Sequence, residues 1–400
     1  MRSFSDPHTI WTLSGIALRM AQRMGIHRDG SNHGLSIFET EMRRRIWLQL
    51  VILEGTSAEF CGVAAAPFVN ADTQLPMNVN DSDLDPRMTE PACEKEGPTE
   101  MIFCLARSEF GGWLRRWRSD ASGSGSPWAF LTSTEMSLSE KDRSIDELEA
   151  VMERKFLRYC DPSIPLHSVT TLMIRSVCHY TRLLAHHPRH HRDSSTRISQ
   201  PEKNLVYENC LRMIEYADYG QTNPDVQQFT WHMANHMPWD AIVIVLSEMH
   251  QRDDLCEKNR VWEIIGSIYG RYVRYRWKNS ETALHRALQR LFIKSWRGYT
   301  DDCRRNGCPP RACPTVIRNM LDNVDSTIES NAQHGNSGLD ASEALEQQVQ
   351  QPPESLLGLG AENAECLLGD SPLDWNEWDR LLDECQDPLG EDMTMMTRSV

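Results

Sequence analysis

Cysteine and histidine supply the side chains in this sequence that could bind a metal or attack a substrate. Cys303, Cys308 and Cys313 recur every five residues, with arginines between them. Two thiolates that share a tetrahedral zinc ion commonly stand in a C-x-x-C pair, because both must reach one metal. The wider spacing therefore favours ordinary thiols near a domain end, with a three-cysteine zinc or redox site as the alternative.

Two groups of histidines offer the other common metal ligand. His232 and His236 lie four residues apart, so on a helix they could share a zinc ion on one face. Met233 stands where a zinc peptidase has its glutamate base, so we expect helix packing or capping instead. The other group surrounds Pro188 and consists of His186, His187, His190 and His191. No carboxylate or thiol has matching spacing, which favours a solvated loop after a helix over a metal or pH-sensitive cluster.

The triplet His27-Arg28-Asp29 has the order of a kinase catalytic loop. That loop needs an Asn five residues after its Asp, and Gly34 stands there instead. No Ser/His/Asp, Cys/His or carboxylate pair elsewhere has a supporting motif. The sequence therefore predicts no enzyme, no catalytic residue, no bound cofactor and no metal ligand, with a site assembled from distant residues as the alternative.

The net charge of −15 is unevenly placed along the chain. Residues 322–400 contain 18 acidic and two basic side chains, which leaves the rest of the chain close to neutral. Such asymmetry indicates an interaction tail. The tail would repel phosphate groups, so we predict no DNA-binding residue and no direct, specific DNA binding by this chain. The sequence has no apolar run of about 18 residues, so we expect no membrane span.

One segment of this tail alternates acidic and large apolar side chains, Leu373-Asp-Trp-Asn-Glu-Trp-Asp-Arg-Leu-Leu382. Segments of this composition are typical of activation domains, which present apolar groups to a coactivator. On a helix, Trp375, Trp378 and Leu382 would share one face at spacings of three and four. The candidate contact residues are Trp375, Trp378, Leu381 and Leu382. The alternative is that the segment docks on the helical part of the same chain, and both interpretations can hold.

Apolar residues recur at helical spacing from the start of the chain. The face of a first helix is defined by Ile10, Leu13, Ala17, Met20 and Met24. Gly25 then stands where a helix commonly ends, because a residue without Cβ takes a left-handed conformation cheaply. Ser36 and Glu39 form a capping box for a second helix. The apolar stripe of that helix is Met42, Ile46, Leu50 and Leu53.

Three consecutive arginines, Arg43, Arg44 and Arg45, lie on the second helix. Consecutive helical residues point about 100° apart, so the three do not form one nucleic-acid patch. We expect a solvated face with i,i+4 ion pairs, from Glu39 to Arg43 and from Glu41 to Arg45.

Helical spacing continues through the middle of the chain, where Ser144 and Glu147 form a second capping box. No segment shows sustained two-residue alternation between hairpin turns. The predicted fold class is therefore all-α, an irregular multi-helix domain over residues 1–320. Its Trp and Met residues are expected to be mostly core, although they could enclose a ligand pocket. Residues 321–400 are predicted to be a disordered acidic tail with the candidate activation segment 373–382, because few apolar side chains are available to offset chain entropy.

Several short motifs follow one another in a recognisable order. They are Gly25-Ile-His-Arg-Asp29, Met42-Arg-Arg-Arg-Ile-Trp47, Glu59 with Gly62, Leu75-Pro-Met-Asn-Val-Asn-Asp-Ser-Asp-Leu84, Thr99-Glu-Met101, Cys160-Asp-Pro, His187-Pro-Arg, Phe229-Thr-Trp231, Trp239-Asp-Ala-Ile242 and Trp296. Their succession over residues 8–300 resembles the fungal-specific transcription factor domain, the middle homology region of the fungal zinc binuclear cluster regulators. The resemblance implies an all-α regulatory domain and a protein of the nucleus.

The resemblance has one departure. In that family a six-cysteine zinc cluster reads DNA, and a linker and further helices follow it. No residue of this sequence matches the cluster, and residue 1 falls inside the middle region. The expectation is a domain that is incomplete at its N-terminus and a chain that lacks its own zinc-cluster DNA reader.

The resemblance and the acidic segment together predict a fungal transcriptional regulator of a pathway gene cluster, such as one for secondary metabolism. The expected partners are a coactivator or the transcription machinery, bound through the acidic tail, and a DNA-binding relative or a second copy of the chain. The alternative function is a non-DNA-binding interaction module that sequesters a full-length relative or its coactivator.

Overall fold

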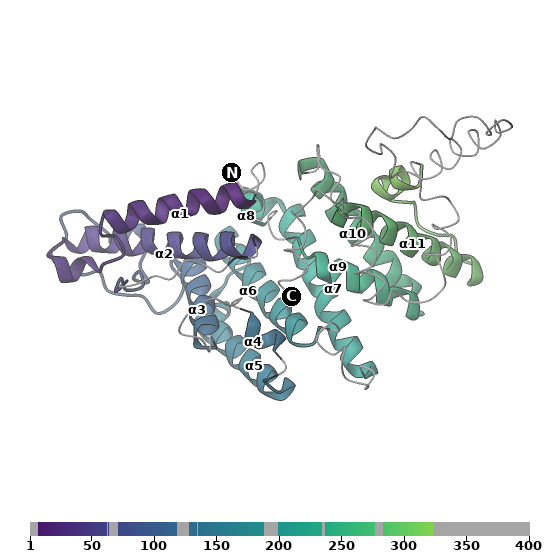
Figure 1. Cartoon of the computed structure of the whole chain (residues 1–400), viewed down its shortest axis with the longest axis horizontal. Coiled ribbons are helices and arrows are strands. Elements are labelled where there is room, and N and C mark those ends of the chain that lie inside the picture. The colour runs from purple at the N-terminus through teal and green to yellow at the C-terminus, as the bar shows by residue number, and fades with distance from the viewer. Residues whose placement is uncertain are drawn as a thin grey trace, which may run out of the picture. The chain divides into compact units, whose positions relative to one another are not determined.

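The computed structural model describes residues 7–61, 63, 71–117, 128–133, 135–187, 199–233, 237–276 and 283–322. Within these ranges the chain forms helices joined by loops and no strand, which confirms the all-α prediction (Figure 1). Of the predicted tail, only Leu321 and Asp322 are described, and they belong to a helical stretch that begins at Thr315. The disorder of residues 321–400 stays a prediction.

The chain divides into two compact units at Ile242. The first unit is built on Met1–Ile242, and the second on Val243–Arg274 and Asn279–Gln386. The helices that lie in the first unit are α1 (Pro7–Arg23), α2 (Ile37–Phe60), α3 (Ile102–Arg116), α4 (Ala129–Thr132), α5 (Leu138–Lys155), α6 (Pro165–Ala185), α7 (Gln200–Thr222) and α8 (Thr230–Met233). The boundary falls within α9 (Trp239–Glu248), and α10 (Leu255–Arg276) and α11 (Ala283–Arg305) follow it.

The first two helices form an antiparallel pair. Near the middle of α1, Ser14 Oγ donates to Glu54 Oε2, in the second half of α2, at 2.7 Å. Near the start of α2, Arg43 Nη1 donates to the carbonyl oxygen of Met24, just beyond the end of α1, at 3.0 Å. These two contacts fix the register of the pair at two separate points.

Local signals set where α1 ends and α2 begins, as the sequence predicts. Gly25 follows α1 with a φ of +70°, a value that residues with a Cβ rarely adopt. The Ser36 hydroxyl accepts from the Glu39 backbone N–H at 3.2 Å, and Glu39 Oε2 accepts from the Ser36 N–H at 3.3 Å. This reciprocal capping box satisfies backbone donors at the start of α2 that have no partner within the helix.

The start of α5 differs from the prediction. A capping box of Ser137 and Glu140 begins the helix, so the predicted box of Ser144 and Glu147 is wrong. Ser144 lies inside α5, where its hydroxyl and its carbonyl oxygen accept from Trp113 Nε1 at 3.1 and 3.2 Å. The pattern Ser-x-x-Glu thus occurs twice, at residues 137–140 and 144–147, and only the first occurrence lies at the start of α5.

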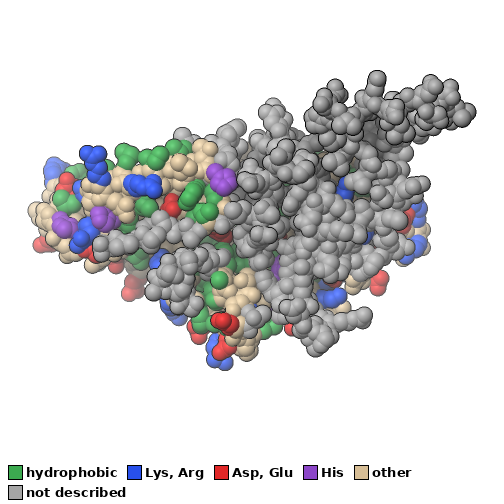
Figure 2. Space-filling view, viewed as in Figure 1, with side chains coloured by type: hydrophobic (Ala, Val, Ile, Leu, Met, Phe, Trp, Pro, Cys, Tyr) green, Lys and Arg blue, Asp and Glu red, His purple; other side chains and the backbone are tan. Residues whose placement is uncertain are grey.

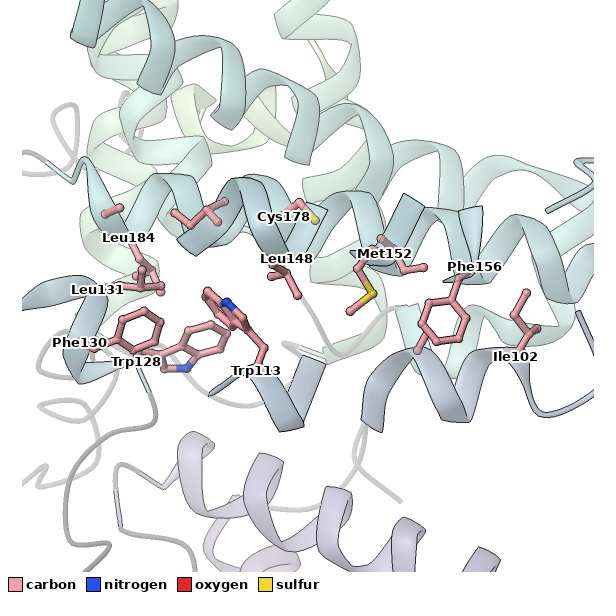
Figure 3. Close-up of a cluster of buried hydrophobic side chains, with 14 residues drawn as sticks. Ile102, Trp113, Trp128, Phe130, Leu131, Leu148, Met152, Phe156, Cys178 and Leu184 are labelled. Atoms are coloured by element: carbon pink, nitrogen blue, oxygen red, sulfur yellow. The ribbon is translucent and has the colours of Figure 1, made fainter. Parts of the chain in front are cut away.

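The main core of the first unit lies between α3, α4, α5 and α6 (Figure 3). Its aromatic side chains include two pairs that pack edge to face. The ring centroids of Trp113 and Phe130 lie 5.2 Å apart, as do those of Trp128 and Tyr180. Truncating a buried aromatic side chain of this size typically costs about 3–5 kcal/mol. For this group of side chains the prediction of a core role is confirmed.

The second unit has an aromatic core of its own between α10 and α11. Trp262, Trp296 and Tyr299 are all buried, and the ring centroids of Trp262 and Trp296 are 5.0 Å apart. Beside them, Lys258 Nζ donates to Asp302 Oδ2 at 2.5 Å, and both side chains are largely removed from solvent. This ion pair joins α10 to α11, and the Asp302 carboxylate neutralises the charge of the buried ammonium group.

Candidate interaction surface on the first two helices

The triplet that resembles a kinase loop forms the centre of a buried ion-pair network. Asp29 is completely buried, and Arg44 from α2 donates to both of its carboxylate oxygens, Nε to Oδ2 at 2.8 Å and Nη2 to Oδ1 at 2.9 Å. The Ser31 and Gln74 backbone N–H groups donate to the same carboxylate. A bidentate arginine and two amide donors together hold one carboxylate between a helix and two loops.

This environment keeps Asp29 charged. The Arg44 guanidinium lowers the pKa of Asp29 well below its usual range, and the Ser31 and Gln74 hydrogen bonds act in the same direction, while burial opposes them. A group that holds its charge so firmly is a poor general base, because a base must accept a proton near the working pH. Asp29 is therefore part of the scaffold.

A second carboxylate on the same surface holds the loop that follows α2. Asp72 Oδ1 accepts from the Asp29 backbone N–H at 2.8 Å and from Arg28 Nε at 3.1 Å. Thr73 Oγ1 donates to the carbonyl oxygen of Ile26 at 3.0 Å. These contacts fasten the loop to the end of α1, so His27-Arg28-Asp29 forms a helix-to-loop junction.

The other arginines of the triplet have separate partners, as their helical spacing predicts. Arg45 pairs with Glu41 at 2.9 Å, the predicted i,i+4 pair, and also with Asp81 at 2.5 Å. Arg43 contacts the end of α1. The prediction of a solvated face is wrong for Arg44 and Arg45, whose side chains are only 15 % and 17 % exposed. Long-range acidic partners, which helical spacing does not reveal, account for the difference.

The apolar stripe predicted for α1 exists, but it faces outward. The side of α1 that packs inward carries Ser14, Leu18 and Ala21. The large apolar side chains on another side of the helix are exposed: Leu13 by 48 %, Ile16 by 48 % and Met20 by 60 %, followed just beyond the helix by Met24 at 62 %. On α2, Ile46 of the predicted stripe is exposed as well. Figure 2 shows apolar side chains along the outer edge of α1.

Basic side chains border this stripe. Arg19 and Arg23 are exposed on α1 and follow Ile16 and Met20 by three residues each, which places them along one edge of the stripe. The helix contains no Asp or Glu. An exposed apolar row beside basic side chains is the kind of surface that a partner helix with acidic and apolar side chains can cover.

A half-buried carboxyl group at the end of α2 is a feature that sequence reasoning missed as a site. Glu59 Oε1 accepts from Trp128 Nε1 at 2.6 Å, beside the Tyr180 ring. Burial raises the pKa of Glu59, and the indole hydrogen bond opposes the shift. The motif position of Glu59 was recognised from sequence, but its aromatic neighbours, Trp128 just before α4 and Tyr180 on α6, lie far along the chain. The contact joins α2 to the main core.

The histidines and cysteines do not assemble into a metal centre in the described parts of the chain. No group of three or more His, Cys, Asp or Glu side chains there could hold a metal ion. His186 bonds Asp142 at 2.8 Å, and both His186 and His187 are buried, so the predicted solvated loop is wrong for them. His232 lies edge-on to Phe103. His190, His191 and His236 lie outside the described residues.

The three evenly spaced cysteines have different environments. Cys303 is buried, Cys308 is exposed and Cys313 is half-buried. The backbone N–H of Cys308 donates to the carbonyl oxygen of Cys303 at 3.0 Å, which is a helix-end contact of the main chain. Burial raises the pKa of Cys313, which disfavours the thiolate form that binds metals.

The candidate activation residues Trp375, Trp378, Leu381 and Leu382 lie outside the described residues, so their role stays a prediction. Among the helices that the structure describes, none is long and apolar enough to cross a membrane.

This fold and surface define a helical domain whose most recognisable motifs form structural ion pairs. Residues 1–107 match the family model of the fungal specific transcription factor domain, which confirms the resemblance and identifies this part of the chain as such a domain. The match covers α1, α2, the loop held by Asp72 and the beginning of α3.

Several curated fungal regulators are similar over more of the chain. The chain is 30 % identical over 411 residues to the aurofusarin cluster transcription factor aurR2 of Gibberella zeae, an alignment that covers 96 % of this chain and 59 % of that protein. It is 27 % identical to the transcriptional regulator AacuB of Aspergillus aculeatus, over 86 % of this chain and 46 % of that protein. It is 28 % identical to the pyriculol/pyriculariol biosynthesis cluster transcription factor 1 of Pyricularia oryzae, over 74 % and 40 %. The chain spans about half the length of these relatives, and no solved structure matches it.

Proposed function

We propose that this chain acts in a fungal transcriptional regulator of a pathway gene cluster, such as one for secondary metabolism. The observation that carries the proposal is the fungal specific transcription factor domain at residues 1–107. It is supported by similarity to proteins whose names assign them to the aurofusarin and pyriculol/pyriculariol clusters. The protein would work in the nucleus.

In this proposal the helical units and the acidic tail have different tasks. The Asp29 network and the aromatic core give the first unit a fixed shape, on which regulatory contacts can form. The acidic segment 373–382 binds a coactivator or the transcription machinery through Trp375, Trp378, Leu381 and Leu382. Contact with DNA is supplied by a DNA-binding relative or by a zinc cluster joined to this domain.

A reporter assay tests the task of the tail. Residues 340–400 are fused to an unrelated DNA-binding domain and expressed in fungal nuclei. We expect the reporter to be switched on, and the double change Trp375→Ala with Trp378→Ala to remove at least nine tenths of the signal. The matched control is Leu356→Ala with Leu357→Ala, which removes two apolar side chains outside the segment and should leave the signal within twofold.

Two outcomes contradict this task. A fusion that is well expressed and nuclear but silent shows that the tail contains no autonomous activation segment. Equal losses from the tryptophan and leucine pairs would show that general apolar content, rather than the segment 373–382, carries the activity.

A further inference from the structure

We propose that Cys303 and Cys308, at the end of α11, form a reversible disulfide in the presence of a low-molecular-weight disulfide such as oxidised glutathione. The observation that carries the proposal is a helix-ending turn that joins the two cysteines through the main chain. The inference concerns a modification site in the second unit, and it does not depend on the proposed function.

The chain leaves α11 through a Schellman motif. The Gly307 backbone N–H donates to the carbonyl oxygen of Arg304 at 3.2 Å, and the Cys308 N–H donates to the carbonyl oxygen of Cys303 at 3.0 Å. Gly307 has a φ of +67°, the left-handed conformation that this motif requires. The two residues joined by the outer hydrogen bond of a Schellman motif commonly have side chains in contact. In this chain both of these residues are cysteines.

The main chain brings the two cysteines within the range of a disulfide. With standard covalent lengths, the 3.0 Å hydrogen bond keeps the Cα atoms of Cys303 and Cys308 less than about 7 Å apart. Disulfides commonly span Cα separations of about 4.4–6.8 Å. The Cys308 thiol donates weakly to the carbonyl oxygen of Asn306 at 3.6 Å. Disulfide formation exchanges this weak contact for a covalent bond through a rotation of the Cys308 side chain.

The two cysteines differ in accessibility, and this difference assigns their roles. Cys308 is exposed, whereas Cys303 is only 2 % exposed and lies beside the Tyr299 hydroxyl. A dissolved disulfide therefore reaches Cys308 first. An accessible thiol next to a second, resolving cysteine is typical of redox-sensitive pairs. Disulfides of this transient kind are the ones that form inside cells.

The exchange proceeds in two steps. The Cys308 thiol loses its proton, and its thiolate attacks one sulfur of oxidised glutathione, which forms a mixed disulfide and releases one glutathione thiolate. The Cys303 thiol then loses its proton and attacks Cys308 Sγ, which forms the protein disulfide and releases the second glutathione thiolate. The two released thiolates take up the two protons. Two protein thiols are thus oxidised, and one glutathione disulfide is reduced to two thiols.

The disulfide would fasten the segment that returns over α10 and α11. After the turn, the Arg311 backbone N–H donates to the Tyr299 hydroxyl at 3.0 Å. Pro314 packs against α10 so closely that a Cβ added at Gly266 would lie 2.9 Å from it. A covalent link at the start of this segment restricts its opened states. Oxidation should therefore slow amide hydrogen exchange of residues 300–311 at least fivefold, and equal exchange in the two redox states would contradict this fastening.

Disulfide mapping of the full chain tests the proposal. The purified protein is equilibrated with reduced or oxidised glutathione, free thiols are blocked with N-ethylmaleimide, and the unreduced chain is digested with trypsin. Arginines separate the three cysteines of this region into the peptides 298–304, 306–311 and 312–318, so mass spectrometry distinguishes their pairings. With oxidised glutathione we expect the 303–308 pair in at least half of the molecules, and at least five times more often than any other pair. Dithiothreitol should remove it.

Two variants test the role of the turn, and both change positions that are not buried. Gly307→Ala keeps every thiol but disfavours the left-handed conformation, so the yield of the 303–308 pair should fall at least threefold. Cys313→Ser removes the neighbouring thiol and should leave the yield within twofold. Exposed Cys93, in the first unit, is the internal control and should keep glutathione as a mixed disulfide.

Four outcomes would overturn the proposal. The first is a Cys308 that keeps glutathione without pairing, which would show that the turn does not bring Cys303 within reach. The second is a dominant pair of either cysteine with Cys313 or with another cysteine. The third is a disulfide between two copies, detected by mixing ¹⁵N-labelled and unlabelled chains. The fourth is an unchanged yield in Gly307→Ala, which would show that the geometry of the turn does not direct the pairing.

Discussion

Replacing Asp29 by Asn removes the charge at the centre of the α1–α2 network while keeping the shape of the side chain. The new side-chain amide could still accept a hydrogen bond through its oxygen, but its nitrogen would face the Arg44 guanidinium or the Gln74 backbone donor, neither of which can accept from it. The change therefore leaves the Arg44 guanidinium without its ionic partner.

The size of the effect follows from burial. Breaking a buried ion pair by removing one partner costs about 3–5 kcal/mol. Because Arg44 keeps 15 % of its side chain exposed and can recover some hydration, we expect the lower end, about 3 kcal/mol. A domain of this size loses about 2–4 °C of melting temperature per kcal/mol, so the first unit should melt about 6–12 °C lower.

The assay is thermal and urea unfolding of the full chain, monitored by circular dichroism, with hydrogen exchange of α1 and α2 peptides to locate the loss of stability. The matched control is Asp85→Asn, because Asp85 pairs with Arg87 in an exposed ion pair at 3.0 Å. Exposed pairs contribute little, so the control should unfold like the wild type.

A double-mutant cycle with Arg44→Met measures the interaction free energy between Asp29 and Arg44 apart from the other effects of each single substitution. The double variant should lose much less stability than the sum of the two single variants, since it leaves no unpaired buried charge. Wild-type unfolding of Asp29→Asn, or losses that add to within about 0.5 kcal/mol, would refute the assignment of this ion pair as a structural centre.

The pH dependence of the same variants has a definite sign. The pKa of Asp29 is lower in the folded chain than its ordinary value of 3.8, so the charged form stabilises the fold above that value. This contribution is lost as the pH falls below about 3.8 toward the lowered pKa. The stability difference between wild type and Asp29→Asn should therefore be constant from pH 6 to 8 and shrink under acid conditions.

Three further changes test other parts of the first unit. Glu59→Gln keeps a hydrogen-bond acceptor for the Trp128 indole and removes the ionisable group. Because the pKa of Glu59 is raised in the folded chain, the stability of the wild type falls as the pH rises. The variant should therefore melt at a higher temperature than the wild type at pH 8 but not at pH 4. Burial raises the pKa of Cys178 to about 12, so iodoacetamide at pH 8 should label exposed Cys93 in the native chain and Cys178 only after unfolding. Gly25→Ala should lower stability by about 1–2 kcal/mol because Gly25 has a φ of +70°, whereas Gly55→Ala within α2 should raise it by about 0.5–1 kcal/mol.

The sequence predicted helix ends better than it predicted helix environments. Gly25 and the box of Ser36 and Glu39 act within four residues, so their signals are complete in a short window. The partners of Arg44 are Asp29 and Gln74, which the fold brings together from 15 and 30 residues away. Helical spacing gave no sign of them, and the expected solvated face was wrong for this reason.

The α1 stripe shows a different limit of periodicity. Spacing identifies the apolar side of a helix, but it does not say whether that side faces the core or the solvent. The inward side of α1 contains Ser14, a polar residue, because its hydroxyl donates a hydrogen bond to Glu54 Oε2 on α2 at an O–O distance of 2.7 Å. Only the tertiary contact shows that the large apolar residues are left outside.

The central claim is that the chain regulates transcription of a gene cluster, and deletion of the gene in the fungus that carries it tests this most directly. Transcripts are measured by RNA sequencing under conditions in which the gene is expressed. We predict at least a tenfold fall for one group of neighbouring biosynthetic genes. A wild-type copy should restore these transcripts, and a copy with Trp375→Ala and Trp378→Ala at equal protein level should not. Unchanged transcripts throughout the genome after deletion would contradict the account.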